Sequence, residues 1–191
     1  DFMDPYYKVR QTVVKDVLYD VNFTAMPAVD RCTSCHLGIA DPDFVDAEQP
    51  YTTHPDLDLY LTSKSPHPEE AFGCTSCHSG RSRGTSFLSS AHTPNSPEQK
   101  KEWKEKYHWK PVKHWLQPML PTRYTQASCF KCHQNTSDLA GAEKINLGLT
   151  LVDRSGCNGC HVSANWPAKG KSGPDLRKLH EKSHPDWVSK W

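Results

Sequence analysis

The sequence is short of the residues that build an ordinary hydrophobic core. Hydrophobic residues make up 36% of its 191 positions, and the mean hydropathy is -0.75. With tyrosine left out and glycine counted in, the apolar share is about 38%, below the roughly 45–50% of a typical globular domain. Prolines occupy a further 15 positions. We therefore expect something other than side chains to fill the interior.

Other features are also missing. No stretch approaches the roughly 18 consecutive apolar residues of a membrane span, and no apolar signal segment stands at the start. Strict alternation of apolar and polar residues, which would predict strands, does not persist. The formal charge of +1 argues against a general nucleic-acid binder. The chain begins Asp1-Phe2 rather than with methionine, which is compatible with an upstream signal or anchor.

The eight cysteines all belong to one repeated pattern, Cys-x-x-Cys-His. It occurs at 32–36, 74–78, 129–133 and 157–161, and we call these pentads motifs 1 to 4. At this composition, chance gives about 0.02 such pentads in the whole chain. The four motifs therefore share a chemical purpose.

The spacing fits covalent haem attachment. Two thiols three positions apart can each add to one vinyl group of the same haem, and the adjacent histidine then meets the iron. Zinc knuckles and disulfides also use paired cysteines, but neither needs a histidine after every second cysteine. The sequence thus predicts four haem c groups. Their thioether residues are Cys32, Cys35, Cys74, Cys77, Cys129, Cys132, Cys157 and Cys160, and their first iron ligands are His36, His78, His133 and His161.

Haem attachment also predicts a location. It needs reduced thiols and dedicated machinery that works outside the cytoplasm. We expect an exported protein, in the periplasm or at the cell surface. One form of this prediction is a protein tethered to a membrane complex.

The chain divides into three predicted regions. Residues 1–27 form an expected helical arm, because valines recur every four positions from Val9 to Val21, and the helix should end near Pro27. Residues 28–140 form a three-haem domain of loops and short helices, with one longer helix over 96–109 that begins at Ser96-Pro97-Glu98. Residues 141–191 form a one-haem module. The predicted fold class is mainly α with extensive loops wrapped around four haems and little or no β-sheet.

The last region resembles a class I cytochrome c. An apolar segment from Ala142 to Val152 leads into motif 4, and Gly173-Pro174 follows it. The resemblance implies a helix before the motif and a Gly-Pro segment that holds the haem-binding histidine. That family normally supplies a later methionine ligand, yet no methionine follows Met119. A new helix start at Ser183-His184-Pro185 suggests a module truncated at its C-terminus.

The motif order across the remaining chain resembles multihaem, here tetrahaem, c-type cytochromes. The segments that carry this resemblance are Val29-Asp30-Arg31-Cys32, Thr53-His54-Pro55, Ser65-Pro66-His67-Pro68, Ala91-His92-Thr93-Pro94 and His114-Trp115. In particular, it is similar to cytochromes that accompany bacterial quinol-oxidising cytochrome b complexes. The resemblance implies electron transfer between a respiratory membrane complex and a soluble or extracellular redox partner.

Seven histidines lie outside the motifs and can supply second iron ligands. His54, His67 and His92 each have a proline one or two places later, which fixes the local chain and suits a metal ligand. His114 follows a break from helix into an aromatic stretch and is the fourth candidate. His108 lies in a charged helical run and is expected in solvent. The alternatives for motif 4 are His180, His184 and Met119.

Charge is segregated along the chain. Residues 37–63 hold six acids and no lysine or arginine, whereas residues 98–114 hold six lysines against three glutamates. Either run is a solvated face or a docking surface for a redox partner.

The favoured function is electron transfer without catalysis. The alternatives are a subunit of an extracellular haem filament, or a multihaem reductase with one open iron.

The first testable consequence is the mass of the mature chain. The intact protein should exceed its polypeptide mass by four haem groups, because each motif binds one haem through thioether bonds. Intact-protein mass spectrometry measures this, and an increment of three haems or fewer contradicts the sequence prediction.

Overall fold

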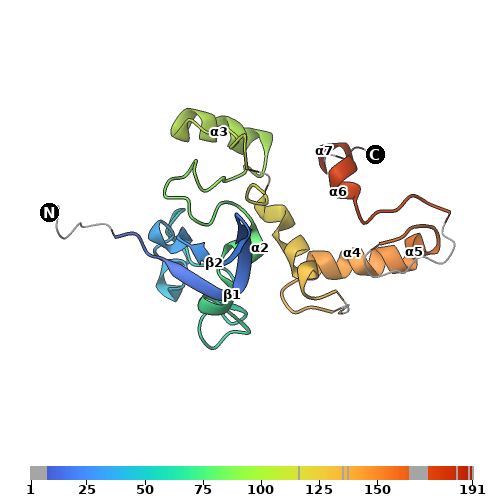
Figure 1. Ribbon diagram of the computed structural model, residues 1–191, viewed down its shortest axis with the longest axis horizontal. Coiled ribbons are helices and arrows are strands. Elements are labelled where there is room, and N and C mark those ends of the chain that lie inside the picture. The colour runs from blue at the N-terminus through green and yellow to red at the C-terminus, as the bar shows by residue number, and fades with distance from the viewer. Residues whose placement is uncertain are drawn as a thin grey trace. The chain divides into compact units, whose positions relative to one another are not determined.

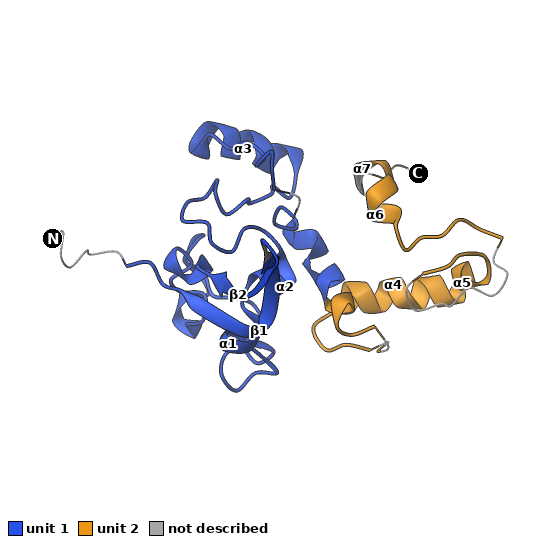
Figure 2. Cartoon of the chain, viewed as in Figure 1, with its two compact units in different colours: residues 1–128 blue, residues 129–191 orange. Residues whose placement is uncertain are grey.

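The computed structural model describes residues 8–115, 117–134, 136, 138–163, 172–183, 185–188 and 190 (Figure 1). The chain forms two compact units, residues 1–128 and 129–191 (Figure 2). Motif 3 therefore groups with motif 4, and the predicted boundary after residue 140 lies inside the second unit. The predicted arm at residues 1–27 belongs to the first unit, where its described part packs beside motifs 1 and 2.

The first unit combines a hairpin with short helices and loops. Its elements in chain order are β1 (Thr12–Val21), β2 (Thr24–Asp30), η1 (Cys32–Ser34), η2 (Pro42–Phe44), β3 (Tyr60–Leu61), β4 (His67–Pro68), α1 (Glu69–Phe72), α2 (Thr75–His78) and α3 (Pro97–Tyr107). Strands β1 and β2 are antiparallel, and β3 and β4 form a short parallel pair. A 3-10 helix, η3 (Thr122–Lys131), crosses the boundary between the units.

The hairpin overturns the predicted N-terminal helix. An interval of four residues returns to the same face of a strand as well as to nearly the same face of a helix, so the valine spacing did not discriminate. The β-branched residues Thr12, Val13 and Val14 favour a strand. Asn22 and Phe23 then form a two-residue turn with φ values of 50° and 68°, which suits the twist of a hairpin. The expectation of little or no β-sheet is wrong here.

Pro27 does not end the segment but lies inside β2, opposite Leu18. The register between the strands shifts between Val14 and Leu18, so residues 15–17 form an irregularity in β1. Proline has no N–H to donate and is tolerated in sheets at edges and bulges. The irregularity therefore accommodates Pro27, which would interrupt a regular series of hydrogen bonds between β1 and β2.

Few side chains fill the interior of either unit. Among the described residues, the buried hydrophobic side chains are Val14, Ala28, Ala91, Ala142 and Val162, all of them small. Two leucines of α4 (Glu143–Arg154), Leu147 and Leu151, remain 59% and 53% exposed. This shortage agrees with the low apolar share of the sequence.

Helix α3 confirms the prediction for residues 96–109. The Ser96 side chain accepts a hydrogen bond from the Gln99 N–H, with Pro97 in the first turn, as expected for a helix start. Trp103 and Tyr107 lie on one face, and both pack against Phe87.

The second unit contains α4, α5 (Cys157–Cys160), α6 (Leu179–Lys182) and α7 (Pro185–Val188). Helix α4 matches the predicted helix before motif 4, and α7 matches the predicted start after Ser183. No helix in the described part of the chain has the length and hydrophobicity of a membrane span.

Gly73 provides a test of this packing. Its φ is 63°, and a Cβ there would lie 2.8 Å from Val14 Cγ2 and closer still to the Asp30 carboxylate. We expect Gly73→Ala to destabilise the first unit by on the order of 2–4 kcal/mol, since it adds both backbone strain and a steric clash. Denaturant unfolding of the mature protein measures the change.

The matched control is Gly148→Ala in α4, where a Cβ meets nothing within 4 Å. This change should be neutral or stabilise the helix by up to about 1 kcal/mol. Equal losses in the two variants would contradict a specific role for Gly73.

Candidate functional site

All four motifs fold into the same single turn. In each, the histidine N–H donates to the carbonyl of the first cysteine, at 2.9 to 3.0 Å. This i to i+4 closure places the two cysteines and the histidine close together along one helical turn. All eight cysteines are free thiols with half-buried or exposed side chains. The repeated pentad thus gives a repeated local structure.

Motif 2 is anchored by a carboxylate from outside it. Asp30 ends β2, is 2% exposed, and accepts hydrogen bonds from the backbone N–H groups of Cys74 and Thr75 and from the Thr75 hydroxyl. These bonds satisfy donors at the start of α2 that have no partner within the helix. Asp30 therefore fixes motif 2 against the strand that leads into motif 1.

Motifs 1 and 2 also meet directly. The thiols of Cys32 and Cys74 are hydrogen-bonding neighbours. This contact, together with burial, raises the pKa of the Cys74 thiol. The first cysteines of two attachment motifs thus lie side by side, although 41 positions separate them in the sequence.

Each of these motifs places its histidine opposite a histidine from a distant loop. The rings of His36 and His92 have centroids 6.3 Å apart. The rings of His54 and His78 have centroids 6.0 Å apart. The sequence named His54 and His92 as second ligands but did not say which motif each would serve. In the structure, His92 is the neighbour of the motif 1 histidine and His54 is the neighbour of the motif 2 histidine.

The spacing within both pairs suits a metal between two imidazoles. A metal–nitrogen distance of about 2.0 Å, with about 1.1 Å from the nitrogen to the ring centre, gives about 6.2 Å between centroids on opposite sides of one metal. Direct stacking of the rings would bring the centroids closer. The two measured separations are close to this value, with the ring planes at 35° in His36–His92 and at 81° in His54–His78.

Backbone carbonyls orient two of these four rings. Nδ1 of His92 lies 2.8 Å from the Phe87 carbonyl, and Nδ1 of His54 lies 2.5 Å from the Pro55 carbonyl. A proton held on Nδ1 leaves the Nε2 lone pair available to a metal. The buried Nδ1 of His36 makes no hydrogen bond to a described residue, although the Pro50 carbonyl slightly favours its protonation.

The surroundings favour the neutral form of three of these imidazoles, those of His36, His78 and His92. Burial, followed by the neighbouring His54 and His36, lowers the pKa of His78 to about 4. Burial also lowers the pKa of His92, and burial together with His92 lowers that of His36. Neutral rings have the free nitrogen that metal binding requires. The effect of His36 on His78 also indicates that the two pairs are neighbours.

An aromatic cluster fixes His92. Phe87 stacks on its ring with centroids 4.5 Å apart, and Trp103 meets Phe87 edge-on at 4.9 Å. The Trp109 indole N–H donates to the His92 carbonyl at 2.8 Å. Helix α3 and the residues just after it therefore fix this histidine, through Trp103 against Phe87 and through Trp109 on the His92 backbone. Phe87 was not singled out by the sequence, since a lone aromatic residue in a serine-rich loop gives no signal.

The other candidates in the first unit lie outside these pairs. Nδ1 of His67 lies 3.0 Å from the Leu59 carbonyl, and its ring packs against Tyr60 and Phe72. His114 and His108 are exposed, the latter as predicted. Met119 forms an isolated antiparallel bridge with Ser79, next to motif 2.

Motif 4 has the neighbour that its family resemblance implies. The Pro174 carbonyl lies 2.9 Å from Nδ1 of His161. Gly173 lies against the same ring, because a Cβ there would be 2.9 Å from His161 Nδ1. Of the proposed second ligands, His184 and the side chain of His180 lie outside the described residues. His133 of motif 3 is half-buried.

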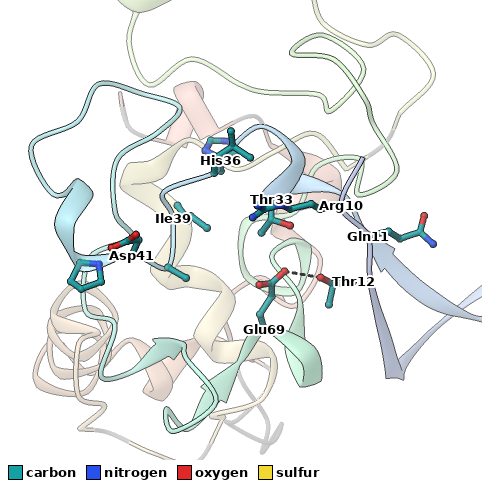
Figure 3. Close-up of a pocket in the computed structure, with 11 residues that line it drawn as sticks. Arg10, Gln11, Thr12, Thr33, His36, Ile39, Asp41 and Glu69 are labelled. Atoms are coloured by element: carbon teal, nitrogen blue, oxygen red, sulfur yellow. Dashed lines mark hydrogen bonds between the residues drawn. The ribbon is translucent and has the colours of Figure 1, made fainter. Parts of the chain in front are cut away.

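A cavity of about 530 Å³ opens beside motif 1 (Figure 3). Residues 10–12, Thr33 and Glu69 line one part of it, and His36 and Ile39 line another. Figure 3 shows Thr12 bonded to Glu69 at its edge. The volume lies in the range of small-molecule sites. Arg10, which also lines the cavity, can pair with an anionic substituent of a group bound there.

In the described part of the chain, no three or more histidine, cysteine, aspartate or glutamate residues are grouped as ligands of a metal ion. The feature that the geometry supports is the pair of opposed imidazoles. Comparison with known protein families, curated proteins and solved structures finds nothing that matches this chain.

Proposed function

We propose that this chain is an electron-transfer protein with four covalently attached c-type haems. The observation that carries the proposal is the opposition of a motif histidine and a distant histidine in His36–His92 and His54–His78, at 6.3 and 6.0 Å. The hydrogen bond from the histidine N–H to the first cysteine, shared by all four motifs, supports the same interpretation. So does the shortage of buried side chains, since haems would supply the missing apolar surface.

When bound, each haem supplies an iron that exchanges one electron between its ferric and ferrous states. The cysteines of the chain fix its position through thioether bonds. In the first unit, the paired imidazoles would hold the iron from two sides, and the carbonyls of Phe87 and Pro55 orient two of the rings. An iron held by two histidines as well as the haem would have no position left for a substrate. This favours electron transfer over catalysis at these two sites.

The second unit is proposed to complete the set. His67 and His114 remain proposed second ligands, without assignment to a single motif. For motif 4, the proposed ligands are His161 with His180, His184 or Met119, or a residue from a partner subunit. The class I resemblance implies a different reduction potential for this haem, because methionine ligation raises the potential relative to two histidines.

The proposed partners are redox proteins, with a membrane electron-transfer complex among them. Two exposed surfaces of opposite charge support this. The segments on both sides of His54 carry exposed acids, and they are Asp41, Asp43, Asp46, Glu48, Asp56 and Asp58. Helix α3, beside His92, exposes Lys100, Lys101 and Lys104 along one flank. Charged faces of this kind steer association with complementary partners. The proposed location is outside the cytoplasm.

The axial pairs are tested by removing one member of each. His92→Ala and His54→Ala should each turn one low-spin haem into a high-spin haem that binds one more equivalent of CO than the unmodified protein. The reason is that alanine leaves one axial position without a protein ligand. Optical and electron paramagnetic resonance spectra of the mature variants measure the change.

The matched control is His108→Ala, which removes an exposed histidine at the end of α3. Its spectra and CO binding should equal those of the unmodified protein. An unchanged spin state in both His92→Ala and His54→Ala would contradict the proposed pairs.

Motif 4 is tested in the unmodified chain. A redox titration with and without CO should show one haem that titrates apart from the other three or binds CO. Four haems confined to one narrow low-potential window, with no CO binding, would rule out a separate module. Polymers in native preparations would instead favour the filament, and turnover at an open iron would favour the reductase.

A further inference from the structure

Asp30 stands out among the buried groups that the axial ligation does not use. It is 2% exposed, and both carboxylate oxygens are engaged. Oδ2 accepts from Cys74 N at 2.5 Å and from Thr75 N at 3.1 Å, while Oδ1 accepts from the Thr75 hydroxyl at 2.9 Å. All of these partners are neutral donors. A carboxylate that only accepts hydrogen bonds is in the state suited to carry a negative charge.

The position of this charge is shared by two attachment motifs. Asp30 is two residues before Cys32 in the chain and bonds to the backbone of Cys74. The Cys32 and Cys74 thiols are themselves neighbours, and Asp30 acts electrostatically on both. The two sulfur atoms, which the proposed function places in thioether bonds, therefore both lie near one buried charge. Burial matters because a charge in the interior is screened much less than one at the surface.

We propose that Asp30 is a positioning residue with a second role, as a fixed negative charge that lowers the reduction potentials of the two haems attached through motifs 1 and 2. This inference rests on the proposed function. A negative charge stabilises the ferric iron over the ferrous iron, which carries one positive charge less. Removing the charge of Asp30 therefore raises both reduction potentials. Removing a hydrogen-bond donor that partly compensates this charge lowers them.

Other nearby groups have weaker claims. Glu69 also acts on Cys32 and Cys74, but it is only partly buried and its carboxylate accepts a hydrogen bond from the Thr12 hydroxyl. The Arg31 side chain donates to Gln11 and to the Arg83 carbonyl. The proposal therefore predicts an order of effects, with Asp30 first, Glu69 second and surface acids last.

The test compares two nearly isosteric variants of the mature, full-length protein. Asp30→Asn removes the charge, so two of the four midpoint potentials should rise. The expected change is roughly tenfold in the ferrous-to-ferric ratio at a fixed potential, equivalent to about 59 mV for one electron. Thr75→Val keeps the charge but removes one donor that partly compensates it. The same two potentials should then fall.

Opposite shifts distinguish charge from structure, because a purely structural role would move both variants in the same direction. Shifts of the same sign, or no shift in either variant, would overturn the proposal. If Asp30→Asn does not mature, two other variants still test the proposal. Thr75→Val should lower the two midpoint potentials, and Glu69→Gln, which removes a second and weaker negative charge, should raise them slightly. Asp46→Asn, at an exposed acid, is the surface control and should leave all four potentials unchanged.

The haem count separates this inference from the function on which it rests. Fewer than four haems in the unmodified protein would contradict the proposed function. Four haems with potentials that do not respond to Asp30 and Thr75 would contradict only the role of Asp30.

Discussion

The hydrogen bonds between the Asp30 carboxylate and the start of α2 hold the first unit together. They connect the end of the hairpin, the entry to motif 1 and the whole of motif 2 at one buried point. Gly73 has the positive φ and the missing Cβ that this approach requires. Losing the carboxylate would leave buried N–H groups without partners. The free-energy cost of such unsatisfied donors is larger than the net contribution of the hydrogen bonds to stability.

Around this point, the structure uses polar contacts where most proteins use apolar packing. The described buried hydrophobic residues are few and small, so loops are fixed by backbone carbonyls, aromatic contacts and side-chain caps. The loops that carry His54 and His92 are examples, since each ring is held by a carbonyl from its own loop. Such loops place an imidazole well but enclose little volume, and the proposed haems would fill the space between them.

The proposed function follows from how these imidazoles are opposed. A histidine whose ring centre lies about 6 Å from that of a second histidine can share a metal with it, and in a haem, whose own nitrogens would occupy the remaining positions, no position would be left for a substrate. The two pairs are close enough for His36 to act on His78. Under the proposed function, neighbouring sites of this kind would exchange electrons, and the two charged surfaces would steer redox partners.

The sequence by itself predicted the proposed chemistry, because Cys-x-x-Cys-His is a local pattern, and in the structure each of its four copies closes with the same hydrogen bond. It also predicted α3, whose start depends on adjacent residues only, and it named His54 and His92 from their nearby prolines. It did not predict the hairpin, since valines four apart fit a strand and a helix equally. The pairing of each histidine with a motif, and the burial of Asp30 between two motifs, were decided by tertiary structure. They depend on contacts between residues 24 to 56 positions apart, and no local pattern records such contacts.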